Sequence, residues 1–315
     1  ELSEDVETAL KKTFLKISQQ VGRKFKTANE LVVKTRILIY SNILFNSENQ
    51  TLKNVVKSLK VLSQCLLEPE IIFETEEVFQ KIPIGRLTIN EIEYVGKNYI
   101  LNLLIHYGLK ASYNQDYSHI AVLEALFDID WTKSMFKEEI KFSLLDHTNQ
   151  NEPIMAGLAL EILSKNNFKE VIPIIYTQLT NELEPARFYA VRCLQYISIE
   201  IVDFPLILSF FAQEQSRWVK QQFIMIFGIW KSNKSFQELL NLIVSNINLD
   251  TKRMILETFR EIVKAKKLSN NEEFQLSKLV MDILLHHKKL GFKENHLIWI
   301  KKIAIDILII FHGHC

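Results

Sequence analysis

The stretch that decides the fold is Glu184-Pro185-Ala186-Arg187-Phe188-Tyr189-Ala190-Val191-Arg192-Cys193-Leu194. Three other segments of the chain follow the same pattern of small, basic and apolar residues. They begin at Glu152, Arg217 and Asp250, so that successive segments are 32 or 33 residues apart. A period of this size is typical of proteins built from stacked helix pairs. The sequence therefore predicts an array of similar helical units.

Prolines mark the same period. Pro153 and Pro185 lie 32 residues apart, and Pro173 and Pro205 are separated by the same interval. Prolines of the first kind start one apolar segment, and prolines of the second kind are expected inside the next. One period thus carries two apolar segments. This predicts an all-α fold, an α-α superhelix (a solenoid of helix pairs) with an N-terminal helical cap.

Two columns of residues recur through the aligned segments. The first column holds the bases Arg187, Lys220 and Arg253. The second column holds residues that we expect to be buried between neighbouring helix pairs, namely Leu158, Ala190, Phe223 and Leu256.

The composition agrees with helices joined by short polar turns. Among 315 residues, 48% are apolar and 24% are charged, an ordinary balance for a globular chain. Only 8 glycines and 6 prolines are present, which disfavours sandwiches, barrels and Rossmann-type folds, because their tight turns need glycine. The 38 basic and 37 acidic residues give a net charge of +1. Nucleic-acid-binding domains usually carry a marked basic excess, which this chain lacks.

Regularity divides the chain into two parts. Residues 70–87 are the least regular, which predicts an N-terminal helical region over 1–87 and a repeat array over 88–315. Thr88-Ile89-Asn90-Glu91 resembles a capping box, so one long helix is expected from residue 88 to Leu109. Apolar spacings of three and four predict the other helices at 1–22, 29–45, 51–67, 118–129, 133–145, 153–164, 168–180, 185–197, 202–213, 218–231, 235–247, 251–265, 272–288 and 295–311.

The quoted segments carry a family resemblance. A helix with a mid-helix proline is followed by an acidic turn and then by a helix that opens with a small or branched residue and a base, as at Ala186-Arg187 and Val219-Lys220. This pattern resembles the HEAT repeat, of the short kind also found in phycobilisome-lyase-like proteins. The resemblance covers about residues 115–311 and is clearest over 152–265. It implies that the second helix of each pair lines a concave face, and that the base near its start ties neighbouring repeats together.

The resemblance implies an architecture and no particular activity. We expect a non-enzymatic scaffold or adaptor that binds a protein or peptide along the concave face of helices 153–164, 185–197, 218–231 and 251–265. The residues expected to contact the partner are Arg187, Arg217, Trp218, Lys220 and Arg253.

Two alternatives stay open. The first is a nucleic-acid-binding protein, similar to the DNA-alkylation-repair glycosylases with HEAT-like repeats, in which Asp128 and Asp130 beside Trp131 are the local acidic candidates. The net charge does not favour it. The second is a regulatory domain of a larger protein, with or without a membrane anchor upstream.

Motifs for catalysis, cofactors and metals are missing from the sequence. It contains no glycine-rich phosphate loop, no nucleophile elbow and no paired C-x-x-C, so we expect no enzyme and no cofactor. His312-Gly313-His314-Cys315 has ligand-type side chains but no fourth ligand at a defined spacing, and no metal site is expected. Three well-separated cysteines favour a reducing compartment, and a cytoplasmic location is expected. No apolar run is long enough to span a membrane.

Overall fold

The computed structural model describes residues 4–20, 25–46, 52–82, 85–109, 117–149, 152–230, 232–245, 247–265, 268–287 and 297–312. Within these residues the chain forms helices and turns and no β-strand, so the predicted all-α class is confirmed. The chain divides into two compact units, Glu1–Asn166 and Asn167–Cys315. Each unit is described by itself.

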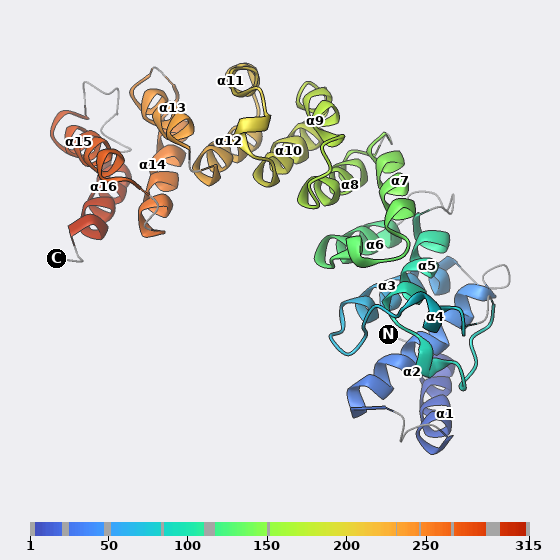
Figure 1. The fold of residues 1–315 in the computed structure, drawn as a ribbon. Coiled ribbons are helices and arrows are strands. Elements are labelled where there is room, and N and C mark those ends of the chain that lie inside the picture. Colours follow the sequence, from blue (N-terminus) through green and yellow to red (C-terminus); the bar gives the residue numbers. More distant parts are fainter. Residues whose placement is uncertain are drawn as a thin grey trace. The chain divides into compact units, whose positions relative to one another are not determined.

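The first unit combines α-helices with short irregular helical turns (Figure 1). In chain order its elements are α1 (Glu4–Gln20), α2 (Ala28–Phe45), α3 (Leu52–Leu67), α4 (Glu76–Phe79), the 3-10 turn η3 (Ile92–Tyr94), α5 (Lys97–Leu104), the π-helical turn η4 (Ile105–Leu109), α6 (Tyr117–Asp128), the 3-10 turn η5 (Trp131–Lys133), α7 (Lys137–Thr148) and α8 (Pro153–Lys165).

Packing in the first unit joins the two sides of the predicted boundary at residue 87. Helix α3 packs against α2, α5 and α6, and α8 packs against α6 and α7. The apolar faces before and after residue 87 therefore close on one another. The division into compact units falls after Asn166 instead, whereas the sequence placed a boundary at residue 87.

The single long helix predicted from residue 88 to Leu109 is wrong. The chain makes η3, breaks at Val95 and Gly96, and starts again as α5. Gly96 is extended, and a Cβ there would overlap the Glu74 carboxylate and the Ile72 carbonyl oxygen. Glu74 accepts hydrogen bonds from the backbone N–H groups of Asn98 (2.9 Å) and Tyr99 (2.8 Å) and so caps α5. A distant carboxylate thus begins this helix, and local sequence does not reveal it.

The second unit repeats one helix pair. Its elements are α9 (Val171–Leu179), α10 (Glu184–Cys193), the 3-10 turns η6 (Leu194–Tyr196) and η7 (Ile199–Ile201), α11 (Phe204–Gln213), α12 (Arg217–Ile229), α13 (Asn233–Val244), α14 (Leu249–Lys264), α15 (Asn270–His286) and α16 (Leu297–His312). The helix expected over 185–197 therefore ends at Cys193 and continues as a 3-10 turn.

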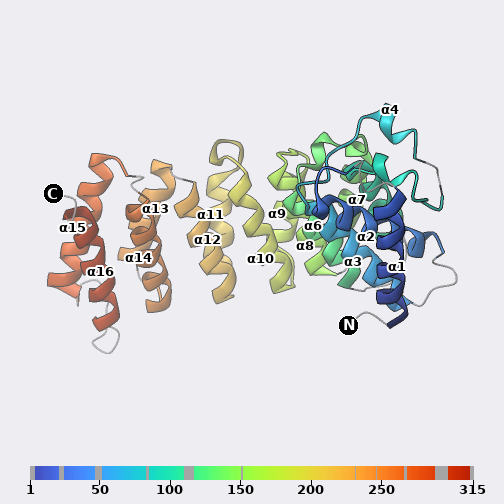
Figure 2. The same ribbon diagram turned by 90° about the horizontal axis from the view of Figure 1, so that it is seen from below.

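Two rows of helices make up this unit. The second helices of the pairs contact one another in order, α10 with α12, α12 with α14, and α14 with α16. We call them the inner row. Helices α9, α11, α13 and α15 form the outer row, which Figures 1 and 2 show beside the inner row. Phe211 of α11, for example, packs edge-on against Phe223 and Phe227 of α12. The arrangement is solenoid-like.

The prolines lie in first turns. Pro153 and Pro185 occupy the first or second position of α8 and α10, and Pro205 does the same in α11. Pro173 is the third residue of α9. The expectation of a mid-helix proline is therefore wrong. The first turn has no carbonyl partner for its N–H groups, so the missing proline N–H costs nothing there.

The predicted buried column is confirmed at three of its four positions. Ala190, Phe223 and Leu256 are buried, whereas Leu158 is half-buried. The repeated column therefore marks where successive inner helices meet the rest of their unit.

Candidate functional site

The inner row of the second unit exposes large apolar side chains. On α12 these are Trp218, Met225 and Ile229, and Trp218 is 66% exposed. Intervals of seven and four residues place them on one side of the helix. The opposite side of α12 holds Phe223 and Phe227, which pack on α11. We call Trp218, Met225 and Ile229 the α12 stripe.

Helix α16 carries a second stripe with the same intervals. Ile298, Ile305 and Ile309 are all exposed, and helical periodicity places them opposite the buried residues Ala304 and Ile307. We call these three isoleucines the α16 stripe. Both stripes therefore lie on the side of the inner row that is turned away from the outer row.

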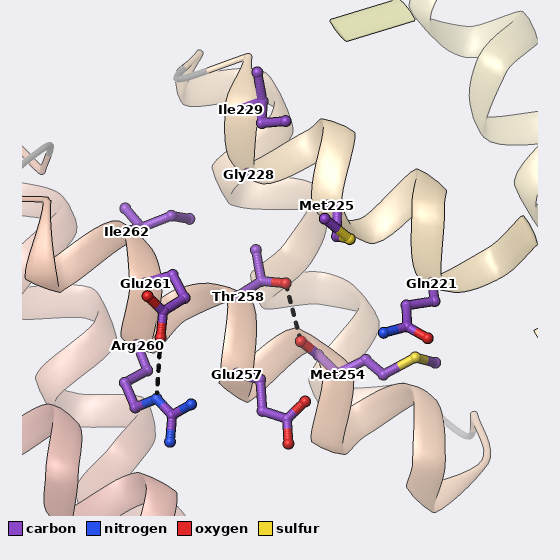
Figure 3. Close-up of a pocket in the computed structure, with 10 residues that line it drawn as sticks. All are labelled: Gln221, Met225, Gly228, Ile229, Met254, Glu257, Thr258, Arg260, Glu261 and Ile262. Carbon is purple, nitrogen blue, oxygen red and sulfur yellow. Dashed lines mark hydrogen bonds and ion pairs between the residues drawn. The ribbon is translucent and has the colours of Figure 1, made fainter. Parts of the chain in front are cut away.

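A pocket of about 390 Å³ lies between α12 and α14 (Figure 3). Met225 and Ile229 of the α12 stripe contribute to its wall, and Met254 and Thr258 of α14 face them. Gly228 allows the two helices to approach at this point, because a Cβ there would lie 2.5 Å from Cγ2 of Thr258. The pocket thus offers an apolar recess beside an exposed apolar stripe.

Helix α14 separates the two stripes with charges that are paired. Nε of Arg253 lies 2.9 Å from Glu257, and Nζ of Lys264 lies 2.8 Å from Glu261. The hydrogen bond from Lys264 is the main reason why the pKa of Glu261 is lowered. Arg260 lies 3.4 Å from Glu261 and 3.7 Å from Asp306 of α16. Bases and acids on this helix therefore largely neutralise one another.

Arg187, the first of the predicted partner-contact residues, lies in an internal network. Its Nε donates to Glu214 (2.7 Å), its Nη2 donates to the other oxygen of that carboxylate (3.1 Å), and its Nη1 donates to the carbonyl oxygens of Asn181 and Glu182 (both 2.9 Å). The Glu214 side chain is 4% exposed. Burial opposes its charge, but the hydrogen bonds from Arg187 and the backbone outweigh burial and lower the pKa of Glu214. The base at the start of α10 thus ties one helix pair to the next.

The other four predicted contact residues fall in different surroundings. Arg217 and Trp218 are exposed in the first turn of α12, and Arg217 lies 3.8 Å from Asp250 of α14. Arg253 is exposed on α14 beside Glu257. Lys220 instead lines a second pocket of about 390 Å³, whose wall includes residues of α11, α13 and α14. Only Trp218 belongs to the α12 stripe.

Sequence reasoning missed the residues that make the pocket. Met225 and Ile229 follow Trp218 at intervals of seven and four, and Gly228 is an isolated glycine in a helical pattern. That glycine was the available signal, since such a glycine often marks close helix packing. The pattern does not say which neighbour approaches, because α14 begins about thirty residues after Trp218.

The four tryptophans divide into two kinds. Trp131 is fully buried, and Nε1 of Trp230 donates to the carbonyl oxygens of Leu194 (3.0 Å) and Ile197 (2.9 Å). Trp218 and Trp299 are exposed on the inner row. Asp130, one acid of the glycosylase-like alternative, lies 3.0 Å from Lys133. Its neighbour Trp131 is fully buried and therefore exposes no ring face on which a base could stack.

The described parts of the chain contain neither a metal-ligand cluster nor a helix suited to crossing a membrane. No group of three or more histidine, cysteine or acidic side chains there is arranged to hold a metal ion. No helix in those parts combines the length and the apolarity that crossing a bilayer requires. Residues 313–315 of the terminal histidine and cysteine cluster lie outside the described residues. Cys65 and Cys193 are buried cysteines that are not joined in a disulfide, and burial raises the pKa of Cys65 to about 12.

In comparisons with known proteins, no family model and no curated protein matched this chain. The resemblance to HEAT repeats therefore stays a prediction from the sequence.

Proposed function

We propose that the chain is a non-enzymatic scaffold or adaptor, and that a protein or peptide partner binds the inner row of its second unit. The observation that carries this proposal is the α12 stripe with the adjoining pocket between α12 and α14. Ordinary monomers rarely expose contiguous large apolar side chains, and such a patch usually marks an interface or a binding groove.

The residue types support a protein partner. Tryptophan, methionine and arginine are enriched at protein interfaces, and the α12 stripe contains a tryptophan and a methionine. Methionine also adapts its shape to different occupants. An apolar side chain of a partner helix or peptide fits the recess beside Met225, and its polar neighbours meet the paired charges of α14.

The charges of the inner row favour a protein partner over a nucleic-acid partner. A nucleic-acid interface needs bases that are available to phosphates. Arg187 is already bound to Glu214, and Arg253, Arg260 and Lys264 each lie within 4 Å of a carboxylate. The bases of this face are therefore largely committed to acids of the same chain.

Substitution of Met225 by glutamate tests the proposal. Val244, exposed on α13 in the outer row, provides a matched control, because Val244→Glu makes the same kind of change away from the inner row. Partners are first identified by cross-linking to the purified chain, and their affinity is then measured by titration calorimetry. We expect Met225→Glu to weaken binding by about thirtyfold, as at a central interface residue, and Val244→Glu to leave it unchanged.

Equal binding by the two variants contradicts the proposal. Retention on DNA or RNA that falls steeply with salt, with no protein partner, supports the nucleic-acid alternative instead.

A further inference from the structure

Helix α15 exposes a second apolar face, which belongs to the outer row and not to the inner one. Phe274 and Leu285 are 70% and 65% exposed, and Met281 is also exposed. Lys278 completes the series at intervals of four, three and four residues, the spacing of a seam between two helices. Helical periodicity places this series opposite Val280 and Ile283, which are fully buried. We call Phe274, Lys278, Met281 and Leu285 the α15 seam.

The other outer helices expose fewer large apolar side chains in the described part of the chain. Helix α9 exposes Thr177, and α13 exposes Lys234 and Asn241, with Val244 only at its last residue. The exposure of three large apolar side chains on α15 is therefore not a general feature of the repeat, and it needs a separate explanation. An exposed stripe of this kind is an interaction surface or an aggregation hazard.

The charges on α15 are complementary to those of a second α15 in antiparallel orientation. Lys278 lies within the seam, and Asp282 borders the seam one helical turn further along. If two α15 helices pack antiparallel about a two-fold axis at residue 280, Lys278 of one copy faces Asp282 of the second copy, and the reverse contact forms at once. The same register sets Phe274 level with His286 of the second copy, one position from Leu285.

Self-complementarity under a two-fold axis is what a symmetric dimer requires, because each patch must recognise its own copy. A helix that lies on a membrane surface typically carries mainly bases beside its apolar face. Here Glu272 and Glu273 occupy the first turn of α15 and Asp282 borders the seam. The mixed charges therefore favour a second copy over a lipid surface.

We propose that this chain forms a homodimer through antiparallel packing of α15 against α15 of a second copy. The proposal is independent of the proposed function, because it uses the outer row. A single helix pair lies at the low end of specific interface sizes, so the dimer is weak, with a dissociation constant on the order of tens of micromolar. A single polar lysine in an otherwise apolar seam fixes the register at some cost in stability.

Sedimentation equilibrium of the whole chain over a wide concentration range tests the dimer. We expect the wild type to self-associate reversibly. Lys278→Asp sets two acids of one copy against two of the other, and Asp282→Lys does the same with bases, so each variant alone is expected to self-associate at least about tenfold more weakly. Phe274→Glu is expected to abolish association.

Variants with complementary charges show whether weaker association comes from the lost charge contact or from a general loss of structure. An equimolar mixture of Lys278→Asp and Asp282→Lys is expected to form heterodimers, and the double variant K278D/D282K is expected to recover the wild-type association. Met225→Glu, on the inner row, serves as the matched control and is expected to leave self-association unchanged. Circular dichroism of each variant reports whether the helices are intact.

Three outcomes overturn the proposal. The first is a wild type that stays monomeric at every concentration. The second is association that survives both Phe274→Glu and Lys278→Asp. The third is failure of both the mixture and the double variant to associate. Binding to phosphatidylserine vesicles that Phe274→Glu abolishes, without self-association, assigns the seam to a membrane surface and also overturns the dimer.

Discussion

Two tryptophans, one in each unit, lie in opposite surroundings. In the first unit Trp131 is 0% exposed, within a region of short helices and irregular turns. In the second unit Trp218 is 66% exposed on a regular row of helices. Irregular turns allow a chain to fold back and enclose its apolar residues. Repeated pairs cover each helix only where its neighbours lie, and the remaining side stays available to a partner.

Two carboxylates at junctions between helices differ in their partners, one in each unit. Glu74 in the first unit is bound by backbone N–H groups of Asn98 and Tyr99, and it begins helix α5. Glu214 in the second unit is bound by Arg187 and links successive helix pairs. One carboxylate stabilises an irregular junction, and the other stabilises a repeated one.

The largest expected difference in stability is between the alanine variants of the two tryptophans. Trp131→Ala opens a cavity in a packed core and is expected to cost about 3 to 5 kcal/mol of unfolding free energy. Trp218→Ala removes an exposed side chain and is expected to cost less than about 0.5 kcal/mol. Urea unfolding followed by circular dichroism measures both. Similar losses in the two variants contradict the contrast between an enclosing and an open unit.

Gly96→Ala tests the junction at Glu74. The added Cβ overlaps the Glu74 carboxylate and the Ile72 carbonyl, so the cap of α5 has to move. We expect a loss of about 3 kcal/mol, because the displaced cap leaves buried backbone groups without partners. The control is Asn102→Ala, at an exposed position of α5, which is expected to change little. An unfolding free energy that Gly96→Ala leaves nearly unchanged rules out the close approach of Gly96 to Glu74 and Ile72.

Arg187→Met breaks the repeated junction and leaves Glu214 buried without its base. The carboxylate keeps hydrogen bonds from the backbone N–H groups of Gln215 (2.8 Å) and Ser216 (2.7 Å). We therefore expect a loss of about 2 kcal/mol, somewhat below the full cost of an unpaired buried charge. A double-mutant cycle with Glu214→Gln isolates the coupling between the two residues. Additive losses in the cycle exclude Arg187 as the tie between helix pairs.

The smallest effects are those of pH, and they differ in sign between the units. Burial raises the pKa of Glu74 above the ordinary value of 4.5. This effect outweighs the hydrogen bonds from the backbone N–H groups of Tyr99 and Asn98, which favour the charged form. The carboxyl group of Glu74 therefore binds its proton more tightly in the folded protein than in the unfolded chain. Its contribution to the free energy of unfolding is full below pH 4.5 and is lost as the pH rises through the raised pKa. For Glu214, burial raises the pKa, but the hydrogen bonds from Arg187 and the backbone bring it below 4.5. Its contribution is full above pH 4.5 and is lost as the pH falls through the lowered pKa.

Comparison of Glu74→Gln and Glu214→Gln with the wild type between about pH 3 and pH 6 measures these signs. The stability difference between wild type and Glu74→Gln is expected to fall as the pH rises, and the difference for Glu214→Gln is expected to grow. Two differences that change in the same direction disprove this assignment.

The sequence predicts more of the second unit than of the first. The recurring prolines and the column of Ala190, Phe223 and Leu256 reflect contacts that repeat at a fixed interval, so one chain contains several copies of the same signal. The break at Gly96 depends on Glu74, which is not part of any repeat. Local patterns such as the capping box at Thr88 therefore predicted a helix that a tertiary contact interrupts.

The candidate site shows the same limit. The resemblance to HEAT repeats implies that a base near a helix start links neighbouring helix pairs, and Arg187 makes such a link to Glu214. Trp218 is predicted as a partner contact, and its side chain is exposed. The pocket itself forms where α14 approaches Gly228. Its lining comes from two helices, and the residues that meet at this approach are about thirty positions apart in the sequence. Periodicity within one helix does not contain that information.

Photo-cross-linking from the inner row tests the central proposal most directly. A benzophenone side chain is placed at Met225 in the α12 stripe, at Ile305 in the α16 stripe and at Val244 in the outer row, and the products are identified by mass spectrometry. We expect the first two positions to capture the same protein partner and the third to capture none of it. Capture of that protein from Val244 as efficiently as from Met225, or no shared product between Met225 and Ile305, contradicts a partner-binding inner row.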